Sequence, residues 1–146
     1  MRKKVKITPF QREILRVLAR SERRSLPALL DDLQSAFPID SYSEQLERLA
    51  RSLGILKRMG CLYVYRIMPP EDRLVYVDEM NRSSLEQLVR WDEMRGGWNL
   101  QPLEPAVIDI IVELTQGGVE VLELDSTQRA LRSDSNYSRD NHTSGC

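Results

Sequence analysis

Two arginines near the middle of the chain have the type and spacing that could do chemistry. Arg48 and Arg51 occur three residues apart in the run SYSEQLERLARSLG, so both would project from one side of a helix. A guanidinium there can donate paired hydrogen bonds to a phosphate or to the edge of a guanine base. Glu44 and Glu47 precede the two arginines by four residues each, a spacing that forms ion pairs on a helix. The outward side of this segment is therefore predicted to be close to neutral.

Catalytic chemistry is not indicated. The single histidine, His142, lies in a polar C-terminal stretch, and Cys61 has no histidine or other obvious base in the predicted folded region that would activate it as a nucleophile. The glycine pairs at 96–97 and 117–118 lack the flanking pattern of a phosphate-binding loop. We expect a protein without enzymatic activity, cofactor or metal.

No targeting or membrane segment is visible. The start of the chain, MRKKVKITPF, is basic but only weakly apolar, and nowhere do about 18 apolar residues follow one another. Cys61 and Cys146 have no metal-ligand spacing and make a poor disulfide pair. These features predict a cytoplasmic protein that does not enter a membrane.

Charge is unevenly distributed along the chain. Residues 1–60 hold 13 Lys and Arg against 7 Asp and Glu, whereas residues 61–146 hold 8 against 15. The two parts therefore carry net charges of +6 and −7, which places opposite fields on the two parts. The stretch 103–125 contains no lysine or arginine. We expect this acidic stretch to lie against the basic part, within one chain or across a dimer, and to shield it.

The elements that would position these charges begin with two helices. Thr8 and Gln11 form a capping box with Pro9 at the first helical position, which predicts a helix to about Arg20. A second helix is expected after Ser25, because leucines follow at helical spacing until a proline ends the pattern.

A third helix and a hairpin come next. Ser41 and Glu44 form a capping box, and Gly54 is expected to be the left-handed residue that ends the helix. Two alternating apolar runs, 61–67 and 74–77, then surround the turn sequence PPED, which predicts a β-hairpin.

This order of elements resembles the winged-helix superfamily of small DNA-binding regulators. The run SEQLERLARSLGILKR is similar to the recognition helix, and the glycine followed by aliphatic residues is similar to the step into the wing. The resemblance covers roughly the first 80 residues. It implies an α+β, mostly helical fold with a three-helix helix-turn-helix core and a β-hairpin wing. It also implies that the third helix enters the major groove.

The rest of the chain is divided into an extension, 81–125, and a tail, 126–146. A helix is predicted from Ser84 to Arg95. Residues 106–124 fit either a helix or a hairpin, and we expect a helix followed by a strand. The polar tail is predicted to be disordered, because it has too little apolar surface to bury.

The predicted function is that of a dimeric transcriptional regulator that binds double-stranded DNA. The alternative is a winged-helix adaptor that binds another protein without touching DNA. A homodimer or a protein partner is expected to use residues 83–125, where Trp91 and Trp98 are either interface anchors or internal packing residues. The residues expected at base edges are Ser43, Arg48 and Arg51, and those expected at phosphates are Lys57, Arg58, Arg73 and the basic N-terminal arm with Arg2, Lys3 and Lys4.

Overall fold

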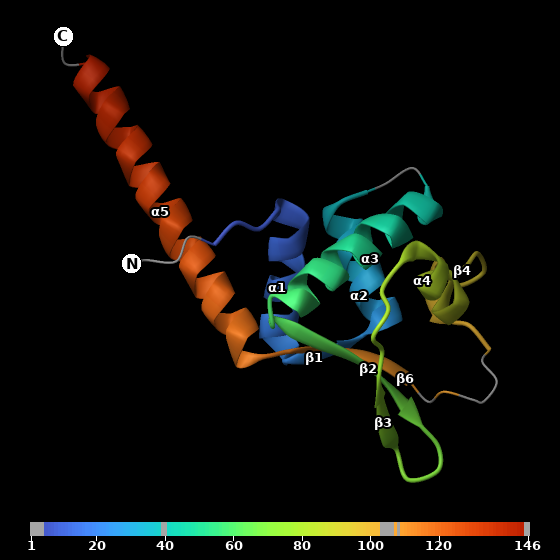
Figure 1. Cartoon of the computed structure of the whole chain (residues 1–146). Helices are drawn as coiled ribbons and strands as arrows, with labels where there is room; N and C mark the ends of the chain where they lie inside the picture. The colour runs from blue at the N-terminus through green and yellow to red at the C-terminus, as the bar shows by residue number, and fades with distance from the viewer. Residues whose placement is uncertain (1–4, 39–40, 103–106, 108, 145–146) are drawn as a thin grey trace.

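The computed structural model describes residues 5–38, 41–102, 107 and 109–144, with side chains as far as residue 132 (Figure 1). Within these residues the fold is α+β, with five helices, one four-stranded sheet and one two-stranded sheet, both antiparallel. Helices α1 to α3 lie on one side of the larger sheet, and α5 projects away from the rest of the molecule.

Helices α1 (Pro9–Ser21), α2 (Leu26–Ala36) and α3 (Tyr42–Arg58) are the three predicted ones. The capping box of α1 is confirmed, since the Thr8 hydroxyl accepts from the Gln11 amide at 3.1 Å and the Thr8 amide donates to the Gln11 side chain at 3.0 Å. The Ser41 hydroxyl likewise accepts from the Glu44 amide, at 3.4 Å. The core between the helices consists of side chains without exposed surface, namely Ile14, Leu15, Leu18, Leu29, Leu30, Leu33, Leu49 and Leu53.

The prediction that Gly54 ends α3 is wrong. The helix runs on to Arg58, and the left-handed residue is Gly60, with φ +76°. The Gly60 amide donates to Lys57 O at 3.0 Å and the Cys61 amide to Leu56 O at 2.9 Å, which is the Schellman arrangement. The helix passes Gly54 because Leu56 is fully buried, and this burial outweighs the low helix propensity of a single glycine.

The four-stranded sheet has the order β1-β6-β2-β3. Strands β2 (Leu62–Met68) and β3 (Arg73–Tyr76) form the predicted hairpin, with Tyr65 opposite Tyr76. Strand β1 (Arg23–Ser25) was not predicted, and β6 (Asp109–Leu114) lies between β1 and β2. The extension beyond residue 80 therefore supplies an interior strand to the sheet of the N-terminal part.

The expected helix-then-strand order within 106–124 is wrong, because the strand β6 comes first and α5 (Gln116–Ser144) follows. Ile110 and Val112 have no exposed surface, and Ile111 is 9% exposed. A strand with neighbours on both sides and little exposed side-chain surface on either face has a continuous apolar sequence. The acidic residues at helical spacing therefore misled the sequence-based prediction.

The predicted helix from Ser84 to Arg95 is also shorter in the structure. Helix α4 (Arg82–Leu88) is followed by a hairpin of β4 (Val89–Asp92) and β5 (Gly97–Leu100). The turn contains Gly96 with φ +71°, and the Asp92 carboxylate accepts from the amides of Met94 and Arg95. The helix ends at Leu88 because Val89 is already extended and pairs with Leu100, and the turn chemistry at Asp92 closes the hairpin that follows.

Residues 126–144, predicted to be disordered, continue α5. The helix begins at a Thr115 cap, whose hydroxyl accepts from the Gly118 amide at 3.1 Å. Asp125 then binds Arg12 of α1, so the start of the helix is held to the body and its backbone can propagate into a polar sequence. Among the helices described, none has the length and apolarity needed to cross a membrane.

Candidate nucleic-acid interface

Helix α3 forms a ridge with a hollow on each side. One hollow lies against the start of α1 and is lined by Thr8, Phe10 and Gln11. The other lies against the start of α4 and is lined by Met80, Asn81, Arg82 and Ser83. Along the ridge between the hollows, Ser43, Glu44, Glu47, Arg48 and Arg51 are exposed.

Arg48 is held by aromatic rings. Its guanidinium carbon lies 4.5 Å from the centre of the Phe10 ring and 5.2 Å from that of Phe37. The two rings meet edge to face at 5.5 Å. A guanidinium that stacks on aromatic rings keeps its in-plane N–H groups free to donate. Arg48 is thus fixed by α1 and the end of α2 rather than by the predicted ion pair with Glu44.

Arg51 keeps the predicted ion pair with Glu47. The closest N–O distance is 3.8 Å, and the two side chains are 74% and 53% exposed. An exposed pair of this kind contributes only about 0.3–0.5 kcal/mol. Arg51 can therefore exchange its carboxylate for a phosphate or a base edge. Arg58 lies seven residues, or about two turns, further along the same side of the helix and is also exposed.

Lys57 makes contacts within the chain that compete with the predicted phosphate contact. Its Nζ donates to the carbonyl oxygens of Val77 and Asp78, both at 2.9 Å, and lies 3.8 Å from the Asp78 carboxylate. It joins the end of α3 to the chain leaving β3. We therefore remove Lys57 from the set of candidate phosphate contacts.

The β2–β3 hairpin has two chemically different faces. Arg73 is opposite Met68, and Arg66 is opposite Val75. Alternation along a strand puts both arginines on the same face of the sheet as Leu62 and Val64, which belong to the core under the helices. Sequence reasoning missed Arg66, although the period of two from Arg66 to Met68 and the hairpin register could have identified it. The opposite face is aromatic.

The start of α1 borders the first hollow, and the basic N-terminal arm precedes it in the sequence. Arg2, Lys3 and Lys4 lie outside the described residues. Lys6 is exposed and Ile7 is buried, and the chain then enters α1 at the edge of the first hollow. The first turn of α1 has no acidic residue, so its amide groups and helix dipole favour an anion there.

Three arginines, Arg12, Arg16 and Arg20, form a basic stripe on α1, and the acidic part of the chain shields part of it. Both oxygens of Asp125, a residue 4% exposed, accept from Arg12 at 2.6 and 3.2 Å. Hydrogen bonding to Asp125 raises the pKa of Arg12 above its ordinary value. Arg16 and Arg20 lie near Glu13, at 3.9 and 3.4 Å. The expected contact between acidic and basic parts thus occurs within one chain, at Arg12.

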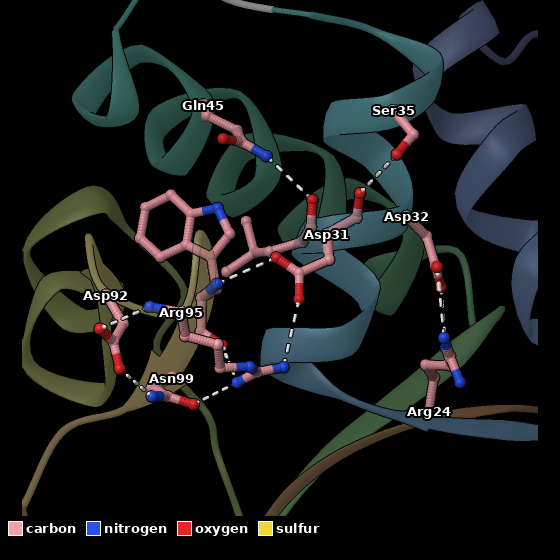
Figure 2. Close-up of polar contacts among 10 residues, drawn as sticks. Arg24, Asp31, Asp32, Ser35, Gln45, Asp92, Arg95 and Asn99 are labelled. Carbon is pink, nitrogen blue, oxygen red and sulfur yellow. Dashed lines mark hydrogen bonds and ion pairs between the residues drawn. The ribbon is translucent and has the colours of Figure 1, made fainter.

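A polar network fixes the β4–β5 hairpin beside the start of α3 (Figure 2). The Asp31 carboxylate accepts from the Trp98 amide at 2.9 Å and lies 3.8 Å from Arg95. The hairpin in turn places Trp91 against Tyr42, with stacked rings 4.5 Å apart. Trp98 is 1% exposed, so it serves packing within the chain and not an interface.

Comparisons with known proteins found no relative of this chain. No protein family, curated protein or solved structure matches the chain.

Proposed function

We propose that the chain binds double-stranded DNA through a winged-helix module built from α1, β1, α2, α3, β2 and β3, and that it acts as a transcriptional regulator. The order helix, strand, helix, helix, hairpin supports this assignment, because a winged helix presents its third helix to the major groove beside the hairpin. The module departs from a self-contained one in that β6 completes its sheet.

The observation that carries the proposal is the orientation of Arg48. Two aromatic rings hold its guanidinium on the exposed ridge of α3. A planar donor fixed in this way loses little side-chain freedom when it binds the edge of a guanine or a phosphate. Arg51 and Ser43 share the ridge, so they are the other candidates for base contacts.

Attraction to the DNA backbone must come from the sides of the ridge. Glu44 and Glu47 balance Arg48 and Arg51, so the ridge itself has no net charge. Arg58, Arg66 and Arg73 are the described candidates for phosphate contacts, and the basic arm adds to them. Three phosphate contacts correspond to a slope of about −3 in a plot of log affinity against log salt concentration.

The test is binding of a fluorescein-labelled mixed-sequence duplex, measured by fluorescence anisotropy across a salt series. We expect binding at low salt and a loss of about tenfold in Arg48→Ala/Arg51→Ala, equivalent to about 1.4 kcal/mol. The matched control is Arg90→Ala/Arg129→Ala, which removes the same charge from exposed positions of β4 and α5. Equal losses in the two double variants, or no binding at low salt, would favour the adaptor hypothesis without DNA contact.

A further inference from the structure

On the β2–β3 hairpin, the face of the larger sheet that points away from the helices is apolar and aromatic. Asp109 and Glu113 of β6 and Arg23 of β1 share this face further across the sheet, and the Tyr65 hydroxyl donates to Glu113 at 3.3 Å. Alternation along the strands places Tyr63, Tyr65 and Ile67 of β2 on this face, and the register adds Tyr76 and Leu74 of β3 and Ile111 of β6. Leu62, Val64, Ile110 and Val112, on the opposite face, belong to the core under the helices, whereas Tyr65 and Ile111 do not.

Three side chains of this face are largely open to solvent. Tyr63, Leu74 and Tyr76 are 50%, 53% and 58% exposed, while Tyr65 and Ile111 form a floor beneath them at 4% and 9%. The ring of Tyr76 meets those of Tyr63 and Tyr65 edge to face, at 5.8 and 6.2 Å. A contiguous exposed apolar cluster of this kind marks an interaction surface.

The same cluster borders the outer edge of β3, with which no strand among the described residues pairs. Strand β3 is the last strand of the sheet, and all four of its side chains are exposed. The Val77 amide donates to Val64 O at 2.9 Å, so by alternation Val75 also bonds to β2, and the backbone groups of Leu74 and Tyr76 point outwards. An open edge beside a face with side-chain contacts is the arrangement that binds an extended peptide as an added strand.

The charges at this edge select the partner. Residues 71–79 contain Glu71, Asp72, Asp78 and Glu79 but only one basic residue, Arg73, for a net charge of −3. Lys57, 3.8 Å from the Asp78 carboxylate, offsets one of these charges, so both ends of the edge remain acidic. Pairing β3 with the β3 of a second copy, in either direction, would bring acidic ends against acidic ends, which is unfavourable. An extended segment with basic ends would find opposite charges at both ends of the edge.

We propose that β3 and the tyrosine face bind an extended segment of another protein, apolar in its middle and flanked by lysine or arginine. The segment adds to β3 as a fifth strand of the sheet, and alternate side chains rest on Tyr63, Leu74 and Tyr76. This surface lies on the hairpin face opposite Arg66 and Arg73, so it is separate from the candidate DNA interface and does not depend on DNA binding.

The test uses the full chain and two synthetic peptides, KKVTVTVKK and EEVTVTVEE. We expect the first peptide to shift the backbone amide NMR signals of residues 73–77, and the second to leave them unchanged. Leu74→Pro removes an outward N–H while sparing the bonds to β2, and we expect it to weaken binding about tenfold relative to Leu74→Ser, which keeps the backbone donor. Unchanged melting curves verify that both variants fold.

A second pair of variants separates charge from shape. Glu71→Lys/Asp72→Lys is expected to lower affinity for the basic peptide, whereas Glu86→Lys/Glu93→Lys, exposed positions on α4 and in the β4–β5 turn, is expected to leave it unchanged. Equal binding of the two peptides, or none at all, would overturn the proposal. Concentration-dependent self-association that Leu74→Pro abolishes would overturn it in favour of a second copy. Arg48→Ala/Arg51→Ala should bind the basic peptide normally, so a failure of DNA binding is read independently.

Discussion

Replacing Gly118 by alanine is predicted to destabilise the chain, whereas the same replacement at Gly54 is predicted to stabilise it. Both glycines lie in helices with φ outside the left-handed region. A Cβ on Gly118 would overlap the carbonyl oxygen of Cys61 and lie 2.5 Å from Leu114 Cδ1. A Cβ on Gly54 would meet its nearest neighbour, Met80 O, at 4.0 Å. The two glycines therefore differ in the room available for a Cβ atom and not in backbone conformation.

The magnitudes follow from two opposing effects. Alanine favours a helix over glycine by about 0.8–1.0 kcal/mol, and this gain should appear nearly undiminished at Gly54. At Gly118 the obstructing atom belongs to the backbone that closes α3, so it cannot rotate away as a side-chain end would. Overpacking of this kind costs about 1–3 kcal/mol. The net change at Gly118 is then a loss of up to about 2 kcal/mol in the free energy of unfolding.

The measurement is urea unfolding followed by tryptophan fluorescence, with far-UV circular dichroism as a check on two-state behaviour. Trp98 is buried and Trp91 is half-buried, so unfolding changes the surroundings of both. We expect a lower urea midpoint for Gly118→Ala and a higher one for Gly54→Ala. A Gly118→Ala midpoint at or above that of the unmodified chain would show that the close approach of α5 to the end of α3 is not rigid.

Substitutions at three further residues, Asp125, Lys57 and Cys61, test individual contacts. Asp125→Ala leaves the guanidinium of Arg12 without its partner and should lower the free energy of unfolding by about 1–3 kcal/mol. Asp125→Asn, which keeps one acceptor, should lose less, and equal losses would contradict the bidentate contact. Lys57→Met should lower the urea midpoint but leave the salt slope of DNA binding unchanged, because Nζ is engaged by carbonyl groups. A slope reduced by about one would restore Lys57 as a phosphate contact. In a Cys146→Ser background, Cys61 should react with Ellman's reagent only as fast as the chain unfolds, since the residue has no exposed surface and burial raises the pKa of its thiol. The thiol ionises more readily in the unfolded chain, so stability should fall as pH rises above about 8.5, and Cys61→Ala should remove this fall.

The elements that follow from local chemistry were predictable from the sequence. Thr8 with Gln11 and Pro9 defines the start of α1, and the hairpin β2–β3 follows from alternating apolar residues around a turn. These signals act over a few residues, so tertiary structure did not override them. The end of α3 at Gly60 required a comparison of two glycines, and only the burial of Leu56 between them decides it.

Features set by distant contacts were not predictable in the same way. The β-branched run of β6 is ambiguous until its neighbours Arg24 and Val64 are known. The candidate nucleic-acid interface likewise has features that were predictable from local sequence and features that depend on distant contacts. The neutral ridge of α3 could be read from the spacing of glutamates and arginines, but the stacking of Arg48 on Phe10 and Phe37 depends on how three helices pack. Likewise, nothing near Lys57 in the sequence indicates that it binds the carbonyl groups of Val77 and Asp78.

Because β6 lies between β1 and β2, the four-stranded sheet cannot close until residue 114 has been synthesised. Arg23 pairs with Glu113, so the contact joins positions far apart in the chain, and such contacts form late and slowly during folding. Until then β2 presents an unpaired edge, with Val64 next to a vacant strand position. A fragment that ends near residue 80 keeps that edge permanently, and open apolar edges recruit other chains. We therefore expect the nascent chain to be vulnerable to aggregation until its C-terminal part emerges, and expect stop codons placed before β6 to yield insoluble protein even though every predicted DNA contact has by then been synthesised.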